Sequence, residues 1–60
     1  MIIKMIHIRQ ANMCSPGARS FFVRHGLDWY SFLKNGIEED ALLSTGDAMA
    51  LRVVEVAYGR

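Results

Sequence analysis

The sequence has few of the features that usually stabilise a very short chain. Cys14 is the one cysteine among sixty residues, so no disulfide can form within the chain. The Cys and His spacings match no usual zinc pattern. A chain of this length buries only about 60% of the surface that it exposes when unfolded, so its stability alone is marginal. These absences predict that a partner or self-association adds stability.

The sequence also lacks an excess of charge of one sign and a long apolar run. Seven Lys and Arg residues nearly balance six Asp and Glu residues, and the net charge is +1. A nucleic-acid-binding domain of this size usually has a clear basic excess, so nucleic acid is not the expected partner. No apolar run reaches the length of a membrane span, and the N-terminal residues do not fit a signal peptide. A free cysteine without such a signal indicates a reducing cytoplasm.

The N-terminal segment, residues 2–9, is predicted to form a β-strand. Four of its eight residues are isoleucine, which favours a pleated surface. A single strand leaves backbone donors and acceptors unpaired. We therefore expect residues 1–10 to be a strand or arm that adds to the sheet edge of another molecule or to its own copy. Ile2, Ile6 and Ile8 are its candidate contact residues.

The following segment, residues 15–58, is predicted to form a cluster of three to four short helices. Ser15 before a proline is typical of a helix start, and Gly26 before a leucine is typical of a helix end. Asp28 and Asp47 are typical N-caps. The expected helices span residues 16–25, 29–35, 38–45 and 47–57. Together with the strand, they predict one small α+β domain over residues 1–60.

The C-terminal segment has an alternative interpretation. Residues 51–58 are rich in valine, which is typical of a strand, and such a strand would pair with residues 2–9. The alanines at positions 48, 50 and 57 and the cap at Asp47 favour a helix instead. The helix is the main prediction, and the strand stays open as the alternative.

Residues that could carry chemistry are few. His25 and Asp28 stand near each other in the sequence, but a helix-end cation and an N-cap explain them as well. Cys14 with either histidine matches no usual metal site, and cysteine is often an ordinary buried residue. The sequence therefore predicts no catalytic residue, no metal and no cofactor, and the protein is not expected to be an enzyme.

Trp29 and Tyr30 are candidate partner-binding residues, because these residue types are enriched at the energetic centres of protein interfaces. A helix-turn-helix over residues 39–57 is the alternative, which would make the protein a small DNA-binding regulator. Its recognition helix would have Arg52 as nearly its only base-reading side chain. A protein partner or self-association is therefore the main expectation, without a small-molecule substrate and without a membrane.

Several short motifs from Cys14 to Ala57 resemble a set of small proteins of tailed bacteriophages and prophages. The motifs are GAR, SFF, RHGLDW, FLKNGI, LL, TGDAMAL and VVE, at residues 17–19, 20–22, 24–29, 32–37, 42–43, 45–51 and 53–55. The resemblance implies a phage setting, in the host bacterial cytoplasm or in the virion, and transfers no site residue. We therefore expect a non-enzymatic protein–protein interaction module, either a virion or assembly component or an inhibitor of a host or defence protein.

Overall fold

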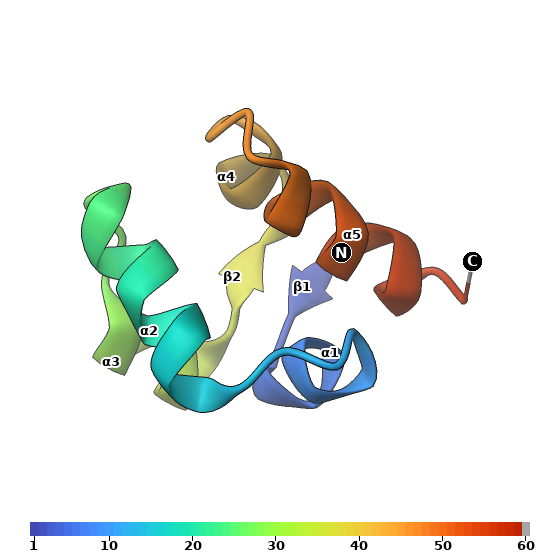
Figure 1. Cartoon of the computed structure of the whole chain (residues 1–60), viewed down its shortest axis with the longest axis horizontal. Helices are drawn as coiled ribbons and strands as arrows, with labels where there is room; N and C mark the ends of the chain where they lie inside the picture. The colour runs from blue at the N-terminus through green and yellow to red at the C-terminus, as the bar shows by residue number, and fades with distance from the viewer. Residues whose placement is uncertain (60) are drawn as a thin grey trace.

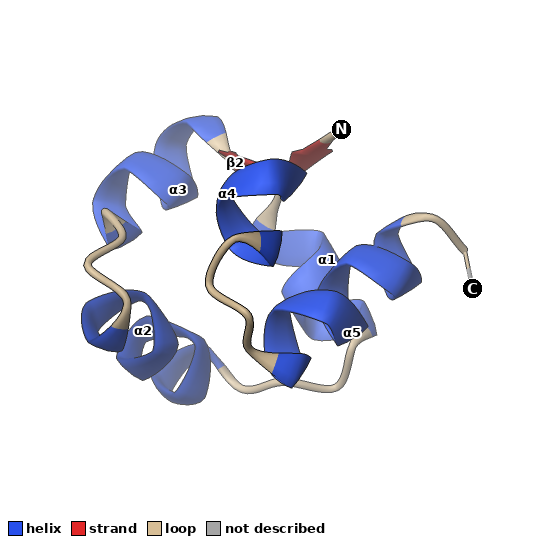
Figure 2. Cartoon of the chain, turned by 90° about the horizontal axis from the view of Figure 1, so that it is seen from above, coloured by secondary structure: helices blue, strands red, loops and turns tan. Residues whose placement is uncertain are grey.

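The computed structural model describes residues 1–59 and shows a small α+β fold, as predicted. In Figure 1 the two strands lie in the middle, with α2 and α3 on one side and α1 and α5 on the other. Figure 2 shows the same division from above. No helix in the described part is long and apolar enough to cross a bilayer. In chain order the elements are β1 (Ile2–Ile3), α1 (Met5–Gln10), α2 (Ser15–Arg24), α3 (Trp29–Asn35), β2 (Ile37–Glu38), α4 (Glu39–Leu43) and α5 (Ala48–Ala57).

The two strands form an antiparallel ladder between the start and the middle of the chain. Ile2 is paired with Glu38, and Ile3 is paired with Ile37. The prediction that the N-terminal strand has no partner in its own chain is therefore wrong. Strand β2 was not predicted, because its two residues lie between two helix signals and are too few to show alternation.

The predicted strand over residues 2–9 is correct only for its first two residues, because α1 follows. Lys4 has an extended backbone, and its N–H donates to Nδ1 of His7 at 2.9 Å. This hydrogen bond satisfies a backbone donor at the point where the helix begins. A strand would place Ile6 and Ile8 on one face, whereas the helix exposes Ile6 and buries Ile8.

The four predicted helices are confirmed, with ends that differ by no more than two residues. The carboxylate of Asp28 accepts from the N–H of Ser31 at 3.0 Å, so Asp28 caps α3 as predicted. The carboxylate of Asp47 accepts from the N–H of Met49 at 2.9 Å and caps α5. The alternative strand over residues 51–58 is wrong, because α5 continues to Ala57.

Helix α2 begins and ends one residue earlier than predicted, and the turn at its end has the predicted form. Cys14, and not Ser15, is the N-cap residue. At the other end, the N–H of Leu27 donates to the carbonyl oxygen of Phe22 at 2.8 Å. Gly26 stands between them with φ +67°, in the left-handed region. This is a Schellman ending, which turns the chain from α2 into α3.

Gly36 lets the first strand pass close to the end of α3. Its φ is +80°, a value that side chains disfavour. A Cβ atom at this position would lie 2.5 Å from Cγ2 of Ile2 and 2.8 Å from the carbonyl oxygen of Ile3. The β1–β2 ladder therefore depends on glycine at this position.

The core draws a residue from nearly every element and has an aromatic centre. Phe22 is fully buried, and its ring centroid lies 4.7 Å from that of Phe32 and 5.3 Å from that of Trp29. Full burial of one such side chain stabilises a fold by about 1.5–3 kcal/mol. Among residues 1–59, no polar or charged residue is buried. The core residues are Ile3, Ile8, Ala11, Ala18, Phe21, Phe22, Phe32, Leu42, Ala50, Val53 and Val54.

Candidate functional site

The interior of the described chain contains no group that suits catalysis. No polar side chain is buried there, and no three side chains of His, Cys, Asp or Glu converge as metal ligands in residues 1–59. The cavity enclosed by the core is apolar and has a volume of about 10 Å³, close to the size of one water molecule. Function therefore has to be sought on the surface.

An open groove of about 550 Å³ runs along the outer side of α2. This helix directs Ala18, Phe21 and Phe22 into the core. The opposite side of the helix points outward, because about 3.6 residues make one turn. The groove is lined by Ser15, Pro16, Arg19, Ser20, Val23, Arg24 and Trp29, which we call the α2 groove.

Val23 and Trp29 give the α2 groove its apolar character. The side chain of Val23 is 71% exposed, the largest exposed fraction among the large apolar residues described. Trp29 is half-buried, since its ring packs on Phe22 with the planes at 78° while another part of it lines the groove. The groove thus combines the aromatic ring of Trp29 with the exposed apolar side chain of Val23.

Tyr30 extends the same surface through Arg19. Its side chain is 67% exposed, and its hydroxyl oxygen accepts a hydrogen bond from Nη2 of Arg19 at 3.1 Å. The guanidinium carbon of Arg19 also lies 5.6 Å from the centre of the tyrosine ring, within the range of a cation–π contact. These contacts place the guanidinium of Arg19 against Tyr30 at the edge of the groove.

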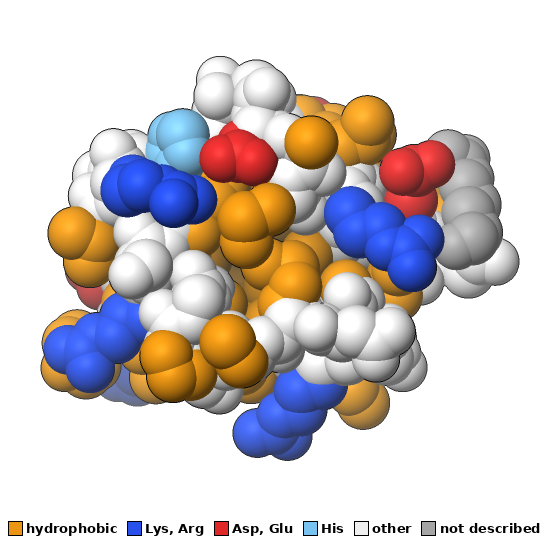
Figure 3. Space-filling view, viewed as in Figure 1, with side chains coloured by type: hydrophobic (Ala, Val, Ile, Leu, Met, Phe, Trp, Pro, Cys, Tyr) orange, Lys and Arg blue, Asp and Glu red, His pale blue; other side chains and the backbone are white. Residues whose placement is uncertain are grey.

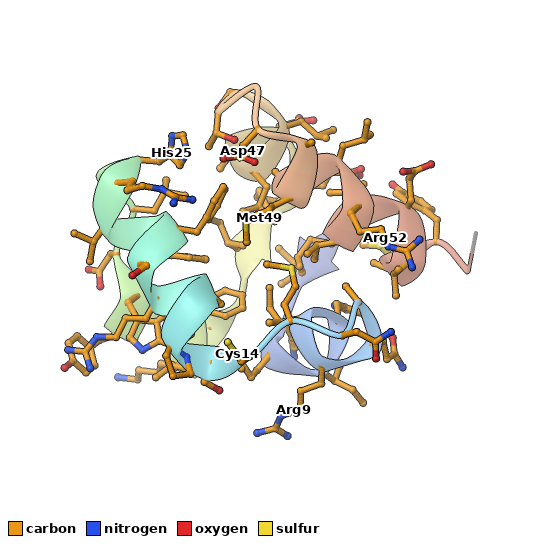
Figure 4. The ribbon with its side chains drawn as sticks, in the orientation of Figure 1. Arg9, Cys14, His25, Asp47, Met49 and Arg52 are labelled. Carbon is orange, nitrogen blue, oxygen red and sulfur yellow. The ribbon has the colours of Figure 1, made fainter. Side chains whose placement is uncertain are left out.

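A small polar cluster at the other end of α2 joins this helix to α5. Oδ2 of Asp47 lies 3.4 Å from Nε2 of His25 and 3.8 Å from Nη2 of Arg24. In Figure 4 the labelled side chains of His25 and Asp47 point toward each other, and Met49 lies below them between the two helices. Figure 3 shows basic, imidazole and acidic side chains meeting at this point of the surface.

The charge of Asp47 is favoured by its surroundings. The N–H of Met49 donates to this carboxylate, and His25 and Arg24 lie beside it, so the pKa of Asp47 falls below its usual value. All these groups are near the surface, where water and salt weaken a single ion pair. The cluster therefore has a capping role and gives no sign of acid–base chemistry.

The structure separates the predicted contact residues of the N-terminal segment from the α2 groove. Ile8 is buried in the core and is not available to a partner. Ile2 and Ile6 are exposed, but neither lines the groove. Trp29 lines it, and Tyr30 holds one of its arginines in place. The two aromatic candidates thus belong to one surface, to which the isoleucines do not contribute.

The residue pairs that the sequence offered for acid–base or metal chemistry have other contacts in the structure. Asp28 caps α3, and His25 lies beside Asp47 instead. Cys14 is exposed at the start of α2, and His7 accepts the N–H of Lys4. Each of these side chains has a local structural role or an exposed position.

The lining residues Pro16, Arg19 and Val23 were missed by the sequence analysis. Their spacing could have shown that they share one side of α2, because positions three, four and seven apart lie on the same side of a helix. The buried pair Phe21 and Phe22 fixes which side of α2 faces inward. The outward side of α2 could have been inferred from that pair. The groove could not, because it also depends on Trp29 of α3.

Comparison of the chain with protein family models, with curated proteins and with solved structures found no match. The functional argument therefore rests on the shape and chemistry of the α2 groove. The resemblance of the short motifs to phage proteins stays a prediction.

Proposed function

We propose that the protein is a non-enzymatic protein–protein interaction module that binds its partner in the α2 groove. One observation carries the proposal: Val23, Trp29 and two arginines line a single open groove on the outside of a small domain. Trp, Tyr and Arg are the residue types most enriched at the energetic centres of protein interfaces. Here they surround an exposed apolar side chain.

The size of the domain supports a role in binding. A standard interface covers about 800 Å² on each partner, and the accessible surface described here is 3832 Å². One such interface would cover about a fifth of this molecule. Pro16 and the start of α2 would fall within that area, together with Tyr30.

The biological setting follows from the phage resemblance alone. We propose a virion or assembly component, or an inhibitor of a host or defence protein, acting in the host bacterial cytoplasm or in the virion. Each of these roles is carried out by binding, which is what the α2 groove supports.

No observation favours the alternative of a helix-turn-helix regulator. Helix α4 has five residues, and the exposed part of α5 offers Leu51 and Arg52. Arg52 is thus the one basic side chain that the described part of α5 would offer to a DNA groove. Binding to duplex DNA that weakens steeply with salt would nevertheless restore this alternative.

The proposal is tested by selecting random displayed peptides on the immobilised protein. We expect enriched peptides that bind the wild type and change the fluorescence of Trp29, the one tryptophan of the chain. Val23→Asp should weaken their binding at least about tenfold, which corresponds to about 1.4 kcal/mol. Leu51→Asp is the matched control, because Leu51 is also exposed and apolar but lies on α5.

Two results would contradict the proposal. One is the absence of any peptide that distinguishes the wild type from Val23→Asp. The other is a set of peptides whose binding depends on Leu51 and not on Val23, since the binding surface would then lie on α5.

A further inference from the structure

We propose that the segment bound in the α2 groove is acidic, with an apolar anchor side chain between two carboxylates. The inference rests on the proposed function and specifies the chemistry of the partner. It follows from the position of the charges along α2, which is separate from the observation that the groove exists.

The two arginines flank the apolar part of the helix surface. Pro16 and Val23 are seven residues apart, so they lie on the same side of α2, about two turns from each other. Arg19 lies toward one side of that line and Arg24 toward the other, because each residue turns the helix by about 100°. An apolar side chain seated near Val23 would therefore have a cation on either side.

The lining of the groove carries no carboxylate to neutralise these cations. Asp47 is 3.8 Å from Arg24, but its own hydrogen bond caps α5. The side chain of Arg24 remains 59% exposed. A partner carboxylate would therefore meet Arg19, whose contacts in the described chain are to Tyr30, and would share Arg24 with Asp47.

Arg19 has donors left for such a contact, and its contacts with Tyr30 restrict its side chain. Its guanidinium is held by the hydroxyl and the ring of Tyr30, and one hydrogen bond uses only one of its five N–H groups. The remaining N–H groups suit a carboxylate, which a guanidinium binds through two parallel hydrogen bonds. A side chain fixed before binding loses less entropy when the partner arrives.

A nucleic acid fits this surface less well than an acidic peptide. Binding of a nucleic-acid backbone needs a basic track, whereas the groove lining has two basic residues and the chain has a net charge of +1. In Figure 4 Arg9 and Arg52 project from other parts of the molecule, on α1 and α5. The observations thus favour a short acidic segment of a protein.

The test uses the displayed peptides described above and examines their charge. We expect the enriched peptides to contain an aromatic or aliphatic residue with Asp or Glu on both sides. The double variant Arg19→Gln/Arg24→Gln should bind them about tenfold or more weakly, and their affinity should fall as salt rises. Arg52→Gln is the matched control, because it removes one exposed positive charge from α5 and should leave binding unchanged.

Thermal unfolding of each variant shows whether it is folded, and Arg19→Lys offers a second check. Lysine keeps the charge but loses the planar donor pair, so it should bind more weakly than the wild type and more tightly than Arg19→Gln.

The outcomes separate this inference from the proposed function. Neutral or basic peptides that still depend on Val23 would overturn the inference and leave the proposed function standing. The absence of any groove-dependent peptide would overturn both. Displacement of the peptides by single-stranded oligothymidine would overturn the acidic protein partner in favour of a nucleic acid.

Discussion

At the scale of single residues, two positions connect the local backbone to the rest of the fold. Gly36 gives the first strand room to approach the end of α3. Asp47 caps α5 and faces Arg24 and His25 at the C-terminal end of α2. Each residue lies at the end of a helix and also contacts another element. Its replacement therefore affects both the helix end and that contact.

Gly36→Ala is expected to be strongly destabilising. The added Cβ would collide with Ile2 and with the backbone of Ile3, and the positive φ would be strained as well. Strain of this kind costs about 1–3 kcal/mol, and the displaced ladder adds to it. Urea unfolding of the variant measures the loss of stability.

Gly26→Ala is the matched control. Its φ is also positive, but nothing lies within 4 Å of the added Cβ. It should therefore carry the strain alone and lose less stability than Gly36→Ala. An equal loss in the two variants would show that the close approach of β1 is unimportant.

Acid is expected to weaken the fold partly through Asp47. Its pKa is lowered by the N–H of Met49 and by His25 and Arg24, so the folded state favours the charged carboxylate. This contribution is fully present above the ordinary aspartate pKa of about 3.9 and is lost as pH falls through the lower folded pKa. Asp47→Asn should retain much of the cap but lose this part of the pH dependence.

Thermal unfolding between neutral and acidic pH checks the role of Asp47. The difference in stability between wild type and Asp47→Asn should shrink at the acidic end. A constant difference would mean that the interactions of this carboxylate do not depend on its charge.

At the scale of elements, the helix ends were predictable and the N-terminal segment was not. Asp28 and Asp47 are recognisable in the sequence because a cap is a local interaction between near neighbours. Residues 5–10 carry a weaker signal, because Lys4 is not a usual cap residue and isoleucine occurs in both strands and helices. The pairing of β1 with β2 brings together segments more than thirty residues apart, which no local pattern encodes.

The candidate surface was also predictable only in part. Trp29 and Tyr30 were identified by residue type. The groove beside them depends on how α2 and α3 pack, through the rings of Phe22 and Phe32. Sequence alone suggested the residue types at the site, whereas the fold determines which side chains share a surface.

The N-terminal segment gives a matched pair of variants at this scale. Ile3 is 0% exposed, so Ile3→Ala should cost about 2–5 kcal/mol. Ile6 is 56% exposed on α1, so Ile6→Ala should change stability by no more than about 0.5 kcal/mol. If residues 2–9 were a continuous strand that binds a partner, Ile6 would matter to association. Chemical denaturation together with light scattering examines both effects.

At the scale of the whole molecule, the described chain is as compact as an ordinary folded domain. Its radius of gyration is 10.0 Å, and about 10 Å is expected for a chain of this length. The internal β1–β2 ladder thus pairs the strand that was expected to pair with another molecule. The proposed binding surface accordingly lies on the outside of α2 and not at the sheet.

The most direct test maps the bound peptide by NMR, through the backbone amide shifts that change on titration with an enriched peptide. The account predicts that the changes concentrate in residues 15–30, around Val23 and Trp29, and leave β1 and α1 nearly unaffected. Changes centred on residues 2–10 would contradict it, because the partner would then bind through the N-terminal segment.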